Sequence, residues 1–279
     1  MKIGIIAPAN SIIGEDNIKL FNKGVKLLEN NGFEVIIGKN VFSNTEGICG
    51  SINEKLNDIY DVSSRAKYII CATGGTNSNC LLDKIDYKRI RDNVFIGNSN
   101  PTLLFNAFYK INNICSFIGP NVKSLAKTKN LFSVNCLRER IINDNKRILA
   151  EKKYIIINKG NASGIAIGGN IQSIRRILGT KYMPKGNNHI LYLEASAKET
   201  SYIEYESIIS QLKQSGIFKG VKGIILGYYD GNVDFYKRIF KGFKIPIIIC
   251  MNLGHNVNNN LLPIGKKISI KDDQIEEIC

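Results

Sequence analysis

The chain has 279 residues, of which 44% are hydrophobic and 9% aromatic, a composition that suits a globular protein with a sizeable core. Lysine and arginine number 38 against 24 acidic residues, a formal charge of +14, but the basic residues are scattered and form no known nucleic-acid-binding motif. We therefore expect no nucleic-acid partner, and an anionic substrate or a generally basic proteome explains the charge equally well.

The cysteines, the histidines and the apolar runs exclude further classes of protein. Seven cysteines without CxxC spacing lie mostly in apolar segments, which indicates a reducing compartment and no disulfide framework. Only two histidines are present and no Cys/His cluster forms, so we expect no metal and no other cofactor. The opening apolar run ends at Pro8, too early for a signal peptide, and no segment approaches the ~20 apolar residues of a membrane span. The expectation is a cytoplasmic protein that does not enter a membrane.

Strands and helices alternate over the first hundred residues. Apolar runs predict strands at residues 3–7, 33–37, 68–72 and 94–96. Apolar residues at helical spacing predict helices at residues 16–30 and 52–66, with a partly helical segment at 81–91. This alternation predicts a doubly wound parallel α/β sheet, in which ligands bind beyond the carboxyl ends of the strands.

The pattern changes in the second half of the chain. Residues 123–161 are polar with weak periodicity and are predicted to be a connecting stretch, part helix and part loop, either a lid or a linker. After it, strands are expected at 190–193, 221–226 and 245–250, a helix at 205–216, and short strands near the end. We predict an N-terminal α/β domain over residues 1–122, the connecting stretch over 123–161, and a smaller C-terminal α/β domain over 162–279.

One segment of the N-terminal half has the layout of a catalytic turn. Residues 94–96 form a short strand, residues 97–100 (Gly-Asn-Ser-Asn) favour a tight turn, and Pro101 suits the first position of a helix. A strand, a sharp turn with Ser99 at its apex and a helix are the parts of a nucleophile elbow. Serine and asparagine are also favoured in ordinary turns and caps, so this segment alone leaves both interpretations open.

A nucleophilic serine needs a base, and the base works best when a third group orients it. His255 follows the predicted strand at 245–250, where a functional loop would emerge, whereas His189 begins a strand and is expected in an exposed loop. Glu194 ends the apolar run 190–193, where a buried charge is costly without a partner. Each residue also fits an ordinary surface position, and the order Ser, Glu, His is not diagnostic.

Short segments in order along nearly the whole chain resemble the LD-carboxypeptidase and microcin C immunity peptidases, which are serine peptidases with a Ser-Glu-His triad. These segments are residues 3–8, 74–82 with 85–87, 97–102, 117–120, 168–170, 178–184, 193–194, 216–227, 254–255 and 262–265. The Asn77-Ser78-Asn79 form of the glycine-rich loop is more similar to the microcin immunity branch. The resemblance implies two α/β domains with the active site at their boundary, in a homodimer.

The resemblance also implies residue roles. Ser99 is the implied nucleophile, His255 the general base and Glu194 its orienting partner. The other implied residues surround the serine: the backbone N–H groups of Gly75 and Asn100 as the oxyanion hole, and Gly74, Asn77 and Asn98 as substrate contacts. The expected reaction is hydrolysis of an amide bond in a small peptide or peptide-like substrate of the murein tetrapeptide class.

Two departures from the family keep other functions open. The family usually has Tyr or His before the nucleophile and Asp after it, where this chain has Asn98 and Asn100. The chain also has no tryptophan, and Phe132 and Tyr154 would have to stack a nucleoside in its place. The alternatives are therefore a microcin C-type immunity peptidase that cleaves a toxic aminoacyl-nucleotide analogue, and a catalytically weakened binding protein of the same fold.

Overall fold

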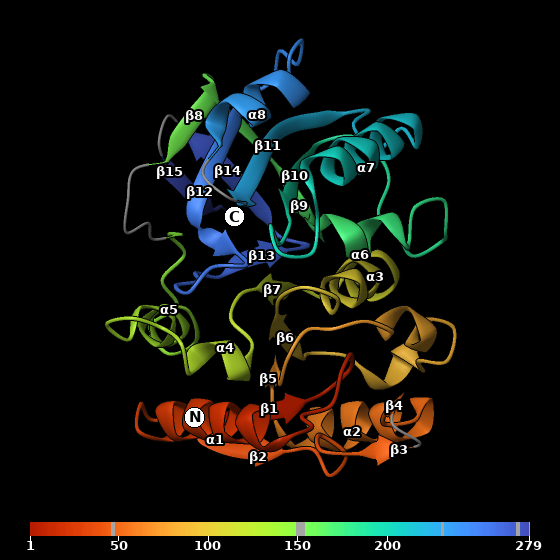
Figure 1. Ribbon diagram of the computed structural model, residues 1–279, viewed down its shortest axis with the longest axis vertical. Coiled ribbons are helices and arrows are strands. Elements are labelled where there is room, and N and C mark those ends of the chain that lie inside the picture. The colour runs from red at the N-terminus through yellow and green to blue at the C-terminus, as the bar shows by residue number, and fades with distance from the viewer. Residues whose placement is uncertain (46–47, 149–153, 230–231, 272–273, 279) are drawn as a thin grey trace.

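The computed structural model describes residues 1–45, 48–148, 154–229, 232–271 and 274–278. Two large sheets lie one above the other, the first built mainly by the N-terminal part of the chain and the second by the C-terminal part (Figure 1). Among the described residues, no helix has the length and apolar character needed to cross a bilayer.

The first sheet is parallel except at one edge. Its parallel strands are β1 (Lys2–Ile6), β2 (Glu34–Ile37), β5 (Tyr68–Cys71), β6 (Val94–Gly97) and β7 (Ser116–Ile118), in the spatial order β7-β6-β5-β1-β2. Counted along the chain this order is 2-1-3-4-5, and the direction of winding reverses between β1 and β5. Ligands in such sheets bind beyond the carboxyl ends at that reversal.

Helices cover both faces of this sheet, which is why its strands read as continuous apolar runs (Figure 1). One face carries α1 (Glu15–Glu29), α4 (Val122–Leu125) and α5 (Phe132–Ile141), and the other carries α2 (Ile52–Arg65) and α3 (Thr102–Asn112). The start of α2 is set by a capping box, in which Ser51 and Glu54 each accept a hydrogen bond from the other's backbone N–H. A short hairpin, β3 (Asn44–Thr45) and β4 (Ile48–Cys49), precedes α2. Of two 3₁₀ turns, η1 (Ser78–Leu81) ends where the segment 81–91 begins, and η2 (Tyr87–Arg89) lies inside that segment.

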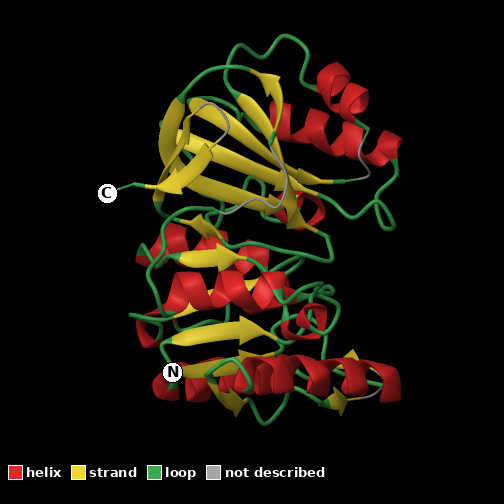
Figure 2. Cartoon of the chain, turned by 90° about the vertical axis from the view of Figure 1, so that its left-hand side faces the viewer, coloured by secondary structure: helices red, strands yellow, loops and turns green. Residues whose placement is uncertain are grey.

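The second sheet has a parallel centre and antiparallel edges, and it curls over the first (Figure 2). Its parallel strands are β9 (Ala162–Asn170), β10 (His189–Glu194), β11 (Val221–Tyr228) and β12 (Ile247–Gly254). The edges are β8 (Ile155–Asn158), β14 (Lys267–Lys271) and β15 (Gln274–Glu277), and the helices of this part are α6 (Ile171–Arg175), α7 (Tyr202–Gln214) and α8 (Val233–Ile239). The predicted fold class, a doubly wound parallel α/β part with a second α/β part, is confirmed.

Two strands join a sheet from outside the range predicted for that domain. β8 lies in the predicted connecting stretch 123–161 but pairs with β12 of the second sheet. β13 (Leu262–Ile264) lies in the predicted C-terminal domain but pairs antiparallel with β7 of the first sheet. Residues 149–153 of the connecting stretch lie outside the described residues, and the division at residues 122 and 162 stays a prediction.

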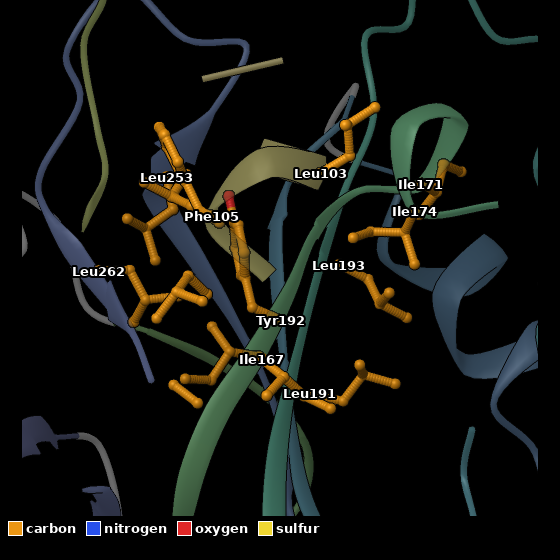
Figure 3. Close-up of a cluster of buried hydrophobic side chains, with 14 of the residues drawn as sticks. Leu103, Phe105, Ile167, Ile171, Ile174, Leu191, Tyr192, Leu193, Leu253 and Leu262 are labelled. Carbon is orange, nitrogen blue, oxygen red and sulfur yellow. The ribbon is translucent and has the colours of Figure 1, made fainter. Parts of the chain in front are cut away.

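The two parts share a hydrophobic core. Leu103 and Phe105 of α3 belong to the same buried cluster as Ile167 of β9, Leu191 of β10 and Leu262 of β13 (Figure 3). Each of these side chains is at most 1% exposed. Because α3 begins at Thr102, three residues after Ser99, this packing ties the serine turn to the sheet that carries Glu194 and leads into His255.

Candidate active site

Ser99 sits in a strained turn between β6 and α3. Its φ of 66° lies in the left-handed region, which non-glycine residues seldom occupy. The backbone N–H and the hydroxyl of Thr102 both donate to the Ser99 carbonyl, at 3.0 and 2.8 Å. Strain of this kind persists only where the surroundings enforce it, as in a nucleophile elbow. The turn also sets Ser99 at the positive end of the α3 macrodipole.

The glycine-rich loop after β5 lies directly against the serine. A Cβ atom on Gly74 would lie 2.7 Å from Ser99 Cβ and 2.9 Å from its Oγ, so only glycine fits there. Gly75 has a φ of +131°, and a Cβ on it would lie 2.1 Å from Asn10 Cγ. In the described part of the chain, no hydrogen bond uses the N–H of Gly75 or of Asn100. Both donors are therefore available to a substrate beside the serine.

Asparagine side chains hold the glycine-rich loop in place. The Asn10 backbone N–H donates to the Gly74 carbonyl at 3.3 Å, and Asn10 Oδ1 accepts from the Thr76 N–H at 3.0 Å. Asn100, which is 1% exposed, accepts through Oδ1 from the Ser78 N–H at 2.8 Å. An aspartate would serve as the same acceptor, so Asn100 in place of the family's Asp preserves this contact.

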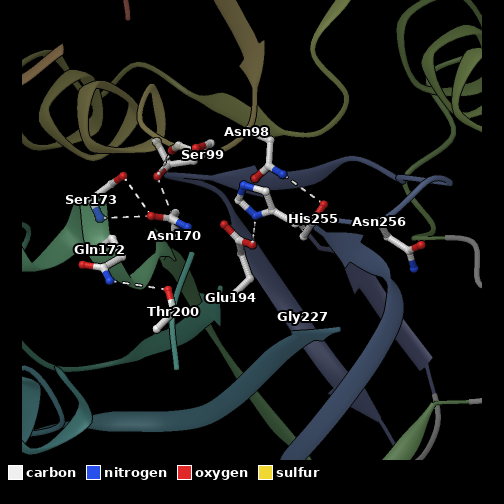
Figure 4. Close-up of polar contacts among 12 residues, drawn as sticks. Asn98, Ser99, Asn170, Gln172, Ser173, Glu194, Thr200, Gly227, His255 and Asn256 are labelled. Atoms are coloured by element: carbon white, nitrogen blue, oxygen red, sulfur yellow. Dashed lines mark hydrogen bonds and ion pairs between the residues drawn. The ribbon is translucent and has the colours of Figure 1, made fainter. Parts of the chain in front are cut away.

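Glu194 and His255 form a hydrogen-bonded pair at the ends of two strands of the second sheet. Glu194 ends β10 and is 0% exposed, and His255 directly follows β12 with a side chain that is 25% exposed. His255 Nδ1 lies 2.7 Å from Glu194 Oε2. Figure 4 shows the imidazole between Glu194 and Asn98, with Ser99 on the same side of the ring as Asn98.

Opposing effects set the protonation of His255. Burial disfavours the imidazolium, but the charge of Glu194 and its hydrogen bond outweigh burial, and Glu199 adds to them, so the pKa of His255 is raised to about 9. Glu194 Oε1 is buried and has no hydrogen-bond partner among the described residues. The charge of Glu194 is therefore balanced mainly by His255, as the orienting carboxylate of a triad requires.

Asn98 connects the serine turn to the histidine loop. Its backbone N–H donates to Asn121 Oδ1 at 3.1 Å, and its side-chain Nδ2 donates to the Gly254 carbonyl at 2.9 Å. Gly254 is the residue before His255, and Asn98 itself is 6% exposed. The predicted substrate contact of Asn98 stays a prediction, and so does that of Asn77, which stands in the left-handed conformation at the start of η1.

The connecting stretch packs against the loop that follows His255. Asn258 Oδ1 accepts from the Thr128 hydroxyl at 3.1 Å and from the Lys129 N–H at 2.9 Å. The Asn259 N–H donates to the Ser133 hydroxyl at 2.8 Å. The loop is thus held at Asn258 and Asn259 by residues 128–133, and at Gly254 by Asn98.

Buried polar residues of α3 fix the junction between the two sheets. Asn106, 0% exposed, donates to the Gly168 carbonyl at 2.8 Å and accepts from the Gly168 N–H at 2.9 Å. The Asn170 N–H donates to the Thr102 hydroxyl at 3.3 Å, and Asn170 is the strand partner of Glu194. Asn10, Asn106 and Asn170 were not predicted as site residues from the sequence, where the available signal was a polar residue inside an apolar helix or at the end of a strand.

The fold thus brings three predicted residues, Ser99, Glu194 and His255, to one site (Figure 4). The contacts of the described residues include no hydrogen bond between the Ser99 hydroxyl and His255. His189 lies at the opposite end of β10 and takes no part in this site. In the described part of the chain, no group of three His, Cys, Asp or Glu side chains is placed to hold a metal ion.

A parallel α/β fold with a serine elbow facing a hydrogen-bonded Glu–His pair defines a class of hydrolase-like proteins, and comparison with known families specifies it. Residues 3–119 match the LD-carboxypeptidase N-terminal domain, and residues 163–270 match the LD-carboxypeptidase C-terminal domain. The chain belongs to the LD-carboxypeptidase family of peptidases, as the sequence resemblance indicated.

Individual relatives cover almost the whole chain. The microcin C7 self-immunity protein MccF of Escherichia coli is 27% identical, over 91% of this chain and 86% of its own length. A Bacillus subtilis protein named as a probable murein peptide carboxypeptidase is 23% identical, over 96% of this chain and 88% of its own. The crystal structure of an MccF-like protein from Bacillus anthracis superimposes with a TM-score of 0.90 at 25% identity, covering 99% of this chain and 96% of that one.

Proposed function

We propose that the protein is a serine carboxypeptidase or amidase that hydrolyses an amide bond in a small peptide or peptide-like substrate. The observation that carries this proposal is the 2.7 Å contact between His255 Nδ1 and the buried Glu194, beside a serine held at a φ of 66°. Family membership supports peptidase activity, and the site supports a serine nucleophile.

The proposed reaction has two halves. Ser99 Oγ attacks the amide carbonyl while His255 Nε2 takes its proton, and the resulting imidazolium is stabilised by Glu194. His255 then protonates the leaving amine as the C–N bond breaks, which leaves an ester on Ser99. A water molecule, deprotonated by His255, attacks this ester. The second tetrahedral intermediate then breaks its bond to Ser99 Oγ, which takes the proton back from His255, and the acid is released.

The oxyanion of both tetrahedral intermediates is proposed to bind the N–H groups of Gly75 and Asn100. Fixed backbone donors need no reorientation as charge develops, and each is worth roughly 10²–10³-fold in rate where such donors have been removed. Asn10 and the Asn100 side chain support this role because they immobilise the glycine-rich loop and the elbow.

The proposed substrate has a free carboxylate, as an L,D-linked murein tetrapeptide does, which suits a chain of charge +14. The likeness to MccF keeps open a second candidate, immunity to a toxic aminoacyl-nucleotide analogue. The first candidate, the murein tetrapeptide, is favoured because the two aromatic side chains that would have to stack a nucleoside are packed against the protein's own hydrophobic clusters. Phe132 packs against the hydrophobic cluster under α1, and Tyr154 packs against the larger cluster with its hydroxyl donating to the Ile148 carbonyl at 2.6 Å.

Labelling with a serine-directed fluorophosphonate tests whether Ser99 is a nucleophile. We expect wild-type protein to label, Ser99→Ala not to label, and Ser64→Ala, at an exposed serine of α2, to label like wild type. Equal labelling of the wild type and Ser99→Ala, or none of either, would leave the third candidate, a binding protein of this fold.

Two substrates separate the enzymatic candidates. Incubation with an L,D-linked tetrapeptide is expected to release D-alanine, whereas a processed microcin-type conjugate is expected to stay intact. Cleavage of the conjugate alone would assign the protein to the immunity branch.

The homodimer implied by the family is also proposed. Light scattering on a sizing column would reveal a monomer if this proposal is wrong.

A further inference from the structure

Two cavities meet at His189, at the end of β10 opposite to Glu194. The first has a volume of about 290 Å³ and the second about 420 Å³, and both are lined by Pro184, Lys185 and His189. Glu194 lies five positions after His189 along the strand, a distance of roughly 17 Å at ~3.3 Å per residue. The mechanism proposed for Ser99 uses no residue of these cavities.

The first cavity combines an apolar wall with a cationic rim. Its apolar residues are Ile167, Leu178, Met183 and Ile217. Lys185 and Lys219 supply positive charge, and Lys110 adds to it from the second cavity. No aspartate or glutamate occurs among the described residues that line either cavity. The combination suits a molecule with an apolar body and a negative charge, and it does not suit a metal cation.

His189 gives the cavities a polar group that is not solvent-exposed. The residue is 7% exposed, and burial, aided by the charge of Lys110, lowers its pKa although the Gly186 carbonyl opposes this. His189 Nδ1 lies 3.2 Å from that carbonyl, so Nδ1 carries the proton and the neutral ring has its acceptor at Nε2. On protonation Nε2 becomes a donor, and a bound anion would favour that form.

The wall of the first cavity is anchored to the N-terminal part of the chain. The Tyr182 hydroxyl donates to Asp83, the Tyr182 ring stacks on Tyr87 with centroids 6.4 Å apart, and Lys181 Nζ lies 3.6 Å from the Asp83 carboxylate. Met183, Pro184 and Lys185 follow immediately. These protein contacts fix the position of the loop, as expected of a preformed small-molecule site.

We propose that this cavity pair binds a small organic anion with an apolar body, such as an acyl carboxylate. The apolar body lies against Ile167, Leu178 and Met183, and the carboxylate is bound by Lys185 and Lys219 beside His189. This site is independent of the peptidase reaction, and its occupation leaves Ser99 and His255 accessible.

The two histidines of the chain allow a site-specific test, because one lies in each site. Octanoate is titrated into the full-length protein while the imidazole Cε1–H resonances of His189 and His255 are followed by NMR, assigned through His189→Gln. We expect saturable displacement of the His189 resonance, a rise in its pKa and little change at His255. Octanamide, which lacks the charge, and inorganic phosphate, which lacks the apolar body, are expected to bind at least tenfold more weakly.

The double variant Lys185→Gln/Lys219→Gln is expected to weaken octanoate binding at least tenfold. Its matched control is Lys19→Gln/Lys23→Gln, which removes the same charge from the exposed face of the distant helix α1. The proposal would be overturned if octanoate shifted only the His255 resonance or shifted the His189 resonance without saturation. Equal octanoate binding by both double variants would also overturn it. Tighter binding of phosphate than of octanoate would overturn the assigned class of ligand.

Discussion

At the scale of single residues, the protonation of His255 limits the proposed chemistry. A general base must be neutral to accept the serine proton, and a pKa of about 9 means that most molecules carry the imidazolium at pH 7. Raising the pH through 9 converts His255 to the active form. Lowering the pH below 9 removes that form progressively.

We therefore expect kcat/KM to rise about tenfold per pH unit below pH 9 and to level off above it. In Glu194→Gln the stabilising charge is lost, so the inflection should move to lower pH while kcat falls by roughly 10³-fold or more. The pH profile of both proteins measures this. An unchanged inflection in Glu194→Gln would show that Glu194 does not act on His255.

Asn98 offers a second prediction at this scale. Its side-chain donor holds the Gly254 carbonyl next to His255, so Asn98→Leu is expected to lower kcat by about 10–100-fold through misplacement of the base, with little change in KM. Asn98→His keeps a donor and should recover most of the activity. If KM rises while kcat is unchanged, Asn98 contacts the substrate, as the sequence analysis predicted, and does not position His255.

At the scale of elements, the approach of the glycine-rich loop to the elbow sets the oxyanion site. A methyl group on Gly74 would lie 2.7 Å from Ser99 Cβ, so Gly74→Ala must separate the loop from the serine. We expect about a 100-fold loss of kcat with the fold retained, since misplacement by an ångström costs about that much. The control is Gly242→Ala, at a turn with no atom within 4 Å of the new methyl group, which should be somewhat less stable but fully active.

At the scale of the whole molecule, the site exists only where the two sheets meet. Asn106 of α3 makes two hydrogen bonds to the backbone of Gly168 in β9, inside a core shared by both parts. Asn106→Ala leaves a buried N–H and a buried carbonyl unpaired. The free energy of unfolding should therefore fall by about 2–4 kcal/mol.

Chemical denaturation of Asn106→Ala, with the half-exposed Asn17→Ala as control, measures this loss. Activity at a temperature where the variant is folded should fall more than its stability alone explains, because α3 also carries the serine turn. A variant as stable and active as the wild type would show that the junction does not depend on this contact.

The sequence was sufficient to predict most helices and strands, but it did not predict which distant segments pair with each other. Apolar periodicity correctly predicted α1, α2, α7 and most strands, because burial of one face dictates the spacing of apolar residues in each element. The residues of β8 were predicted to be part of a connecting stretch. The strand was missed because edge strands are short and their pairing partner is remote in sequence. β13 was expected as a strand, but no local pattern could show that it would pair with the other part's sheet.

The amino-acid sequence by itself determined the α/β class, the serine turn and the residues that match the peptidase family. Tertiary structure decided which of two histidines meets Glu194, and that asparagines at positions 10, 98, 100, 106 and 258 hold the parts of the site together. The physical reason is range: strand and helix patterns arise between near neighbours in the chain. A hydrogen bond between residues 98 and 254 depends on a packing that brings the ends of two sheets face to face.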